Sequence, residues 1–203
     1  MSQANKMKRF LLYYCFAILF SFISCQRDTS SNSQSYLALG DNYTIGVSVF
    51  ESQSWPMQLI KLLSEKNIHI SSPKIIAKKG LTTDELKIEI NNSILDYPYD
   101  WVSLLIGVNN QYQGTSIQEF KKQFESLVFD AITLSGNKKK VFVVSIPDWS
   151  VMPFAEDLDK EKIAIEIDNF NQIIYEIGAI EGINFIDITP ISRIAKTRND
   201  FIA

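Results

Sequence analysis

The chain has 203 residues, of which 46% are hydrophobic, enough for one domain with a single buried core. Its 23 acidic residues outnumber its 20 basic ones, giving a formal net charge of −3, which argues against nucleic acid as a partner. There are two cysteines, and Cys15 lies within an N-terminal apolar stretch. We therefore expect no disulfide, so that packing alone must stabilise the fold.

The N-terminus has the pattern of a bacterial secretory signal. Lys6, Lys8 and Arg9 precede an apolar core of 14 residues, 10–23, whereas spanning a bilayer takes roughly 20 residues. A small residue, Ser24, then precedes Cys25, which resembles the lipobox whose Cys is acylated and becomes the first residue after cleavage. We expect a signal peptide at 1–24, a lipid on Cys25, and a protein anchored to a membrane of the bacterial cell envelope, facing the periplasm or the exterior.

The rest of the chain divides into a tether and one domain. Removing residues 1–24 takes away three cations and no acids, so the formal net charge of the mature chain becomes −6. Residues 25–35 are polar and Ser-rich, as is typical of a flexible tether. Residues 36–203 contain no internal repeat or second linker, so we expect one globular domain, acting as a monomer.

Strand and helix patterns alternate along this domain. Five short apolar runs bounded by turn residues predict buried parallel strands, at 36–39, 75–77, 101–106, 141–146 and 183–186. Apolar residues at helical spacing lie between them: Leu59, Leu62 and Leu63; Leu86 and Ile90; Phe120, Phe124, Leu127, Val128, Ala131 and Leu134; Ile163, Ile167, Phe170, Ile174 and Ile177. This alternation predicts an α/β fold, a three-layer α/β/α sandwich around a five-stranded parallel sheet of flavodoxin-like type.

Three motifs follow the first three predicted strands. They are G-D-N-Y-T at 40–44, Gly80 after the second strand, and G-V-N-N at 107–110. In this order and spacing they resemble the SGNH (GDSL) ester hydrolases, a family of lipases and acylhydrolases, over nearly all of residues 36–200. Each motif alone also fits a turn or a helix cap in a protein without catalytic activity.

The resemblance implies a role for each matched residue. Asn42 stands where the family has the Ser that attacks the ester carbonyl. Gly80 would give its backbone N–H, and Asn109 its side-chain amide, to the oxyanion hole. Asn110 replaces the final Asp of G-x-N-D. We expect Tyr43, Asn110 and Trp149 to contribute to substrate binding, with core packing as an equal alternative for Trp149.

The general base of the family is missing from its expected place. The chain has one histidine, His69, placed before the second strand and thus at the end of that strand opposite Gly80. Asp200 aligned with the family's D-x-x-H block puts Ala203 in the His position; alternatively, the domain is truncated at its C-terminus before that block. We prefer truncation, which would leave one covering layer of the sheet incomplete.

Two classes of function remain. The first is an ester hydrolase lipoprotein that is inactive or crippled as written, because both the nucleophile and the base are missing. The second is a catalytically dead, lipid-anchored binding protein for an acyl or carbohydrate ligand. A third account is a point change or a frameshift in this copy of the gene. No phosphate-binding loop and no paired His or Cys is present, so we expect neither a cofactor nor a metal.

Overall fold

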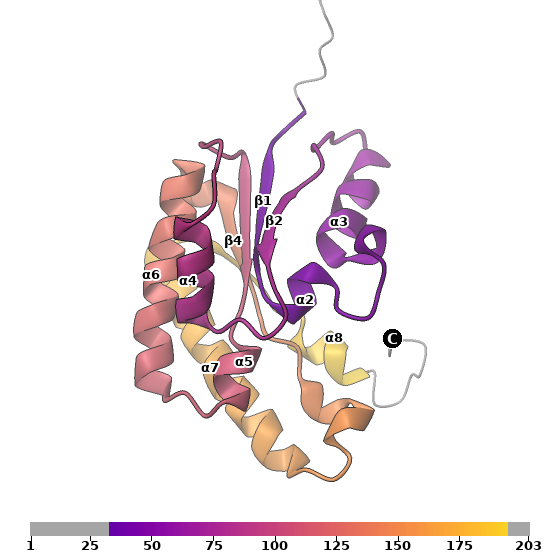
Figure 1. Cartoon of the computed structure of the whole chain (residues 1–203), viewed down its shortest axis with the longest axis vertical. Helices are drawn as coiled ribbons and strands as arrows, with labels where there is room; N and C mark the ends of the chain where they lie inside the picture. The colour runs from indigo at the N-terminus through magenta and orange to yellow at the C-terminus, as the bar shows by residue number, and fades with distance from the viewer. Residues whose placement is uncertain (1–32, 195–203) are drawn as a thin grey trace, which may run out of the picture. The chain divides into compact units, whose positions relative to one another are not determined.

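The computed structural model describes residues 33–194, in which five parallel strands form one sheet of order β2-β1-β3-β4-β5 (Figure 1). The strands are β1 (Tyr36–Gly40), β2 (Lys74–Ala77), β3 (Trp101–Leu105), β4 (Val141–Val144) and β5 (Asn184–Ile186). The predicted five-stranded parallel sheet is confirmed. The predicted signal peptide, Cys25, most of the tether and the segment around Asp200 lie outside the described residues.

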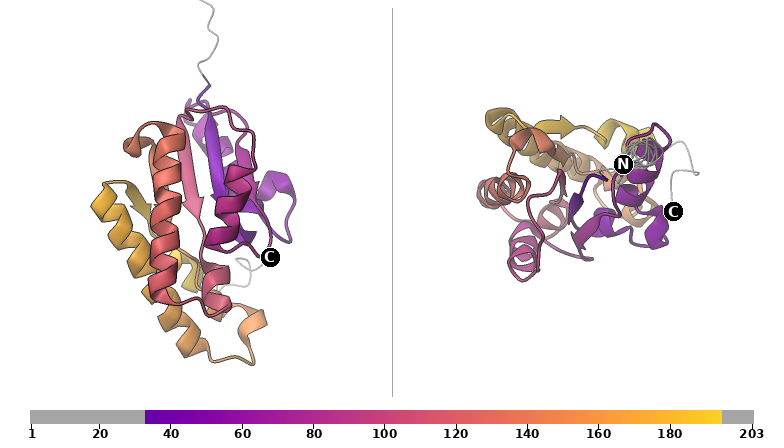
Figure 2. Two further views of the ribbon diagram at one scale, coloured as in Figure 1. Left: turned by 60° about the vertical axis from the view of Figure 1, so that its left-hand side comes forward. Right: turned by 90° about the horizontal axis from the view of Figure 1, so that it is seen from above.

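Helices lie on both faces of the sheet, α3 on one and α4 and α6 on the other (Figures 1 and 2). The α-helices of the described part are α2 (Asn42–Ile45), α3 (Trp55–Ser64), α4 (Thr83–Asn91), α5 (Val108–Tyr112), α6 (Ile117–Ser135), α7 (Lys160–Glu181) and α8 (Thr189–Ile194). Short 3₁₀ helices connect them: η1 (Glu51–Gln53), η2 (Lys138–Lys140), η3 (Trp149–Val151) and η4 (Pro153–Ala155). Within residues 33–194, none of the helices combines the length and the apolar character that crossing a membrane requires.

The core lies between the sheet and helices α4, α6 and α7. All the apolar positions predicted for the faces of these three helices are buried. The rings of Phe120 on α6 and Phe170 on α7 have centroids only 4.5 Å apart, which joins the two helices over the sheet. Helices α6 and α7 end at Gly136 and Gly182 in the left-handed conformation, as their sequences predict.

Two expectations about burial were wrong. Strands β2 and β5 are not fully buried, because the strand order puts them at the edges of the sheet, where one side lacks a neighbour. Leu62 of α3 is 56% exposed. At about 100° per residue it lies to one side of the arc shared by Pro56, Leu59 and Leu63. Pro56 is the buried residue of this helix.

The turn after β3 depends on Gly107. Its φ is +130°, a conformation that side chains rarely allow. A Cβ built there would lie 2.8 Å from Cδ1 of Ile146 and 2.9 Å from Cε2 of Phe120, so the turn also packs directly against the core. Gly114 has a similar constraint on its backbone, with φ of +74°, but no atom lies within 4 Å of its Cβ position.

We therefore expect Gly107→Ala to destabilise the fold by about 2–4 kcal/mol, because overpacking adds to backbone strain. Gly114→Ala is the matched control and should cost about 1 kcal/mol, since strain acts there alone. Urea unfolding followed by circular dichroism measures both. Equal losses in the two variants would show that the core contact of Gly107 does not matter.

Candidate functional site

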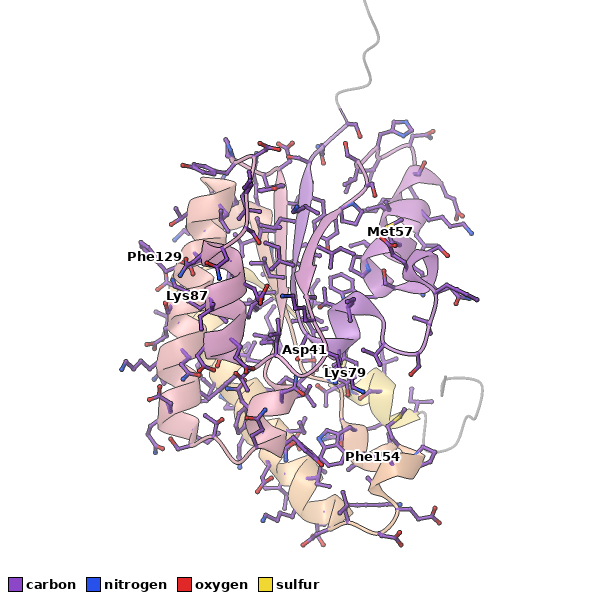
Figure 3. All side chains as sticks on the ribbon, viewed as in Figure 1. Asp41, Met57, Lys79, Lys87, Phe129 and Phe154 are labelled. Carbon is purple, nitrogen blue, oxygen red and sulfur yellow. The ribbon has the colours of Figure 1, made fainter. Side chains whose placement is uncertain are left out.

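The carboxyl ends of β1, β2 and β3 lie together at one end of the sheet, its carboxyl edge. In the parallel register Gly40 of β1 lies beside Ala77 of β2 and Leu105 of β3. The segments that follow these strands contain all three sequence motifs, and Figure 3 shows Asp41 and Lys79 at this edge. The structure therefore brings Asn42, Gly80 and Asn109 to the same edge, where α/β folds commonly place their sites.

Asn42 makes a direct hydrogen bond across this edge. The backbone N–H of Gly80 donates to its side-chain Oδ1 at 2.6 Å. Gly80 has a φ of +89°, which lets the turn after β2 present that N–H towards α2. The amide oxygen at the nucleophile position thus occupies the donor that the resemblance assigns to an oxyanion.

Asn109 is also engaged within the chain. It lies on α5, immediately after the turn at Gly107, and its Nδ2 donates to the carbonyl of Leu81 at 2.8 Å. Leu81 adjoins Gly80, so the side chains of Asn42 and Asn109 bond to neighbouring peptide groups of one turn. The two expected oxyanion donors are close together, and the protein's own oxygens accept from both.

Asn110 has a structural place. It is completely buried; its Oδ1 accepts from the N–H of Thr83 at 3.0 Å and its Nδ2 donates to the hydroxyl of Thr83 at 2.8 Å. These bonds tie α5 to the start of α4. Nothing in its placement supports the predicted contact with substrate, because both polar atoms of its side chain are already bonded.

Tyr43 and Trp149 lie at the same end of the sheet. Tyr43 packs against the core, and burial, with Asp41 and Asp148 nearby, raises the pKa of its phenol above the ordinary value. Trp149 is only 8% exposed, and its indole N–H donates to Oε1 of Gln111 at 2.8 Å. Trp149 therefore has the packing role that was its alternative; a substrate contact of either side chain remains a prediction.

An aromatic cluster surrounds Trp149, and no sequence motif indicates it. Its ring lies 5.8 Å from those of both Tyr112 and Phe154, measured between centroids, and these two are 6.4 Å apart. Tyr112 is 61% exposed and Phe154 70% exposed. They lie on α5 and η4, which are only five and three residues long, too short for a periodic pattern to signal them.

Asp148, shortly after β4, is a polar residue that the motifs do not indicate. Its carboxylate accepts from Nε of Arg193 at 2.7 Å and from the N–H of Ser150 at 2.9 Å. Arg193 also bonds to Asp168 at 2.8 Å. These contacts connect α8 to the loop that contains Trp149, so they hold that part of the edge in place.

His69 lies at the opposite edge of the sheet. Its carbonyl accepts from the N–H of Gln34, just before β1, while Asn42 follows the last residue of β1. A strand rises about 3.3 Å per residue, which separates the two by roughly 20 Å. His69 is exposed and is too distant to act on residue 42. Among residues 33–194 no group of three His, Cys, Asp or Glu side chains is placed to hold a metal.

Comparison with known proteins shows the family of the chain. A family model described as GDSL-like lipase/acylhydrolase matches residues 38–201. The chain belongs to this family. A search of curated proteins found no match to the chain.

Solved structures of the same fold include family members. AlinE4, an SGNH-hydrolase family esterase, superposes with a TM-score of 0.65 at 18% identity, over 84% of this chain and 83% of that one. TesA gives 0.59 at 17% identity, over 75% and 77%. The acetylxylan esterase Axe2 from Geobacillus stearothermophilus gives 0.62 at 15% identity, over 81% and 80%.

This GDSL-family chain also buries a carboxyl group beside residue 42. Asp41 caps α2 through Oδ1, which accepts from the N–H of Tyr43 at 3.1 Å. Its Oδ2 is buried with no hydrogen-bond partner in the described structure. Burial raises the pKa of Asp41 to about 7, although the N–H groups of Tyr43 and Gly107 lower it in part.

The raised pKa of Asp41 predicts a loss of stability at higher pH. The unfolded chain releases this proton near pH 4 and the folded one near pH 7, so stability falls as pH rises between these values. Asp41→Asn keeps a cap residue and removes the buried charge. With about 1.4 kcal/mol per pKa unit, we expect it to stabilise the fold by roughly 2–4 kcal/mol at pH 8 and little at pH 4.

Thermal unfolding at several pH values checks this expectation. The control is Asp157→Asn, which changes an exposed acid and should leave the difference from wild type independent of pH. A constant offset between Asp41→Asn and wild type from pH 4 to 8 would show that folding does not shift the pKa of Asp41.

Proposed function

We propose that this chain is a lipoprotein of the GDSL family whose site hydrolyses esters very slowly or not at all. One observation carries the proposal: Oδ1 of Asn42 accepts the N–H of Gly80. Residue 42, where the family has its nucleophile, is instead the acceptor in a hydrogen bond within the site. This bond joins α2 to the turn after β2.

The chemistry of acyl transfer supports this view. Ester cleavage needs a nucleophile that a base can deprotonate, and donors that bind the resulting oxyanion. A carboxamide has no such nucleophile, and His69 lies at the opposite edge of the sheet. A substrate carbonyl would also have to displace Asn42 from Gly80 and Leu81 from Asn109. Covalent catalysis therefore loses its nucleophile and base, and oxyanion stabilisation is weakened.

The alternative is a binding protein for an acyl or carbohydrate ligand. The same polar groups could exchange their internal partners for those of a ligand without breaking any covalent bond. Axe2, named as an acetylxylan esterase, and AlinE4, named as an esterase, make an ester or a part of one the reasonable ligand class. The two classes differ in whether any turnover remains.

Activity on a small activated ester separates the two classes. We expect the chain to hydrolyse p-nitrophenyl acetate no faster than a control protein, because losing a nucleophile alone costs roughly a factor of 10⁶ in turnover. Asn42→Ser should recover little, since a Ser without a base remains protonated near neutral pH. Asn42→Ala is the matched control for the change in the hydrogen bond to Gly80.

Release of nitrophenol at 400 nm measures the rate. Robust hydrolysis by the wild-type chain, abolished by Asn109→Ala, would contradict the proposal and indicate another nucleophile at the same edge. If hydrolysis is slow and Asn42→Ala leaves its rate unchanged, residue 42 does not contribute to the remaining activity.

We further propose that Cys25 is lipidated and holds the domain at a membrane of the cell envelope. The support is in the sequence, where the signal pattern ends at Ser24-Cys25 and a polar segment leads to β1. Such a tether of about ten residues spans roughly 30 Å at full extension. The site would thus work near a membrane, on ligands outside the cytoplasm.

Metabolic labelling with a fatty acid tests the anchor. We expect label on the wild-type protein, and none on Cys25→Ala, which should also leave the membrane fraction. Cys15→Ala is the control and should keep the label, because that residue would be removed with the signal peptide. Label that persists in Cys25→Ala would show that the anchor lies elsewhere.

A further inference from the structure

The aromatic cluster shares helix α5 with Asn109 of the candidate site. Tyr112 follows Asn109 by three residues on α5, so both lie on one side of that helix. Phe154, on η4, lies at the same end of the molecule as Asp41 and Lys79 (Figure 3). Both exposed rings therefore lie at the end of the molecule where Asn42 meets Gly80.

The contacts of Trp149 fix the arrangement of the cluster. Trp149 contacts both exposed rings and is itself fixed by Gln111, whose Nε2 donates to Oε2 of Glu166 at 2.8 Å. Lys162 lies 3.8 Å from the other oxygen of Glu166. Because Trp149 and its partners are already ordered, a ligand that stacks on the rings pays little entropy to organise them.

We propose that Tyr112 and Phe154, supported by Trp149, form an aromatic shelf that binds the ring of a neutral saccharide beside the Asn42 site. The inference rests on the proposed function and names the class of ligand for that site. In this proposal the ligand contains a glycan, which binds at the shelf outside the site around Asn42.

The openness of the shelf favours a sugar over an acyl chain. Its two outer rings are 61% and 70% exposed, so an acyl chain lying on them would keep much of its surface in water. An acyl chain gains binding free energy in proportion to the apolar area that it buries, so an open surface suits it poorly. A pyranose is rigid and has a C–H face for the negative face of an aromatic ring, while its hydroxyls stay solvated.

The polar groups around the shelf fit the same ligand. Glu166 and Lys162 lie beyond Gln111 at one border of the cluster and offer an acceptor and a donor for hydroxyl groups. Their charges are opposite and adjacent, so they do not select a charged ligand. The shelf supplies apolar contact, and this border supplies hydrogen bonds that fix the orientation of the ring.

The test measures binding of ester-free probes, which does not depend on catalysis at residue 42. The probes are xylotetraose, cellotetraose, mannotetraose and chitotetraose, titrated by calorimetry into the wild-type domain. We expect at least one to bind, and Tyr112→Ala with Phe154→Ala to weaken it at least tenfold. Phe129→Ala is the control: Phe129 is also 70% exposed, lies on α6 (Figure 3), and should change the affinity less than twofold.

A second variant separates ring stacking from general apolar contact. Tyr112→Leu with Phe154→Leu keeps apolar side chains against Trp149 but removes the flat faces, and should also lose the saccharide at least tenfold. Octanoate is the acyl probe. Octanoate binding that the Leu variant retains and the Ala variant loses, without saccharide binding, would assign the shelf to acyl chains and overturn the proposal.

Two further results would also overturn it. One is no binding of any of the four saccharides at 10 mM by the folded wild-type protein; the other is binding that both double variants leave unchanged. The outcome is independent of the activity assay. Hydrolysis of p-nitrophenyl acetate would refute the proposed function and would not bear on saccharide binding by the shelf. Failure of saccharide binding would refute the shelf and would not bear on whether the site hydrolyses esters.

Discussion

The parallel register of β1, β2 and β3 is the constraint on which the site depends. It places Gly40, Ala77 and Leu105 side by side, so that three separate turns leave the sheet at one edge. The hydrogen bond from Gly80 to Asn42 then joins the first turn to the second, and that from Asn109 to Leu81 joins the third to the second. Hydrophobic packing holds the strands, and these polar bonds hold their ends.

The polar groups of this edge mostly satisfy one another. Asn42, Asn109 and Asn110 each bond to the chain between Gly80 and Thr83, which gives the edge a connected network with few free groups. Asp41 and Thr44 are exceptions, since Oδ2 of Asp41 and Oγ1 of Thr44 are buried without a partner. The network contributes stability and order, and Asp41 makes that stability depend on pH.

In the two proposals, ligand binding and catalysis depend on different residues. In the proposed function, an ester would bind beside Gly80 and Asn109, whatever the residue at 42 does. The shelf at Tyr112 and Phe154 lies beyond it, on side chains that the reaction does not require. Loss of the nucleophile would therefore leave glycan binding intact. A binding protein without catalytic activity requires this.

The sequence by itself determined the alternation of strands and helices, the apolar faces of α4, α6 and α7, and the order of three motifs along the chain, because local periodicity and turn residues carry that information. It did not indicate α2, α5 or α8, which are too short for a periodic pattern. Only the tertiary structure decided that Asn42 accepts from Gly80, that Asn110 is buried against Thr83, and that Tyr112 and Phe154 meet over Trp149. Such contacts join residues from different turns, and their partners are set by strand order and register, which no local pattern of side chains encodes.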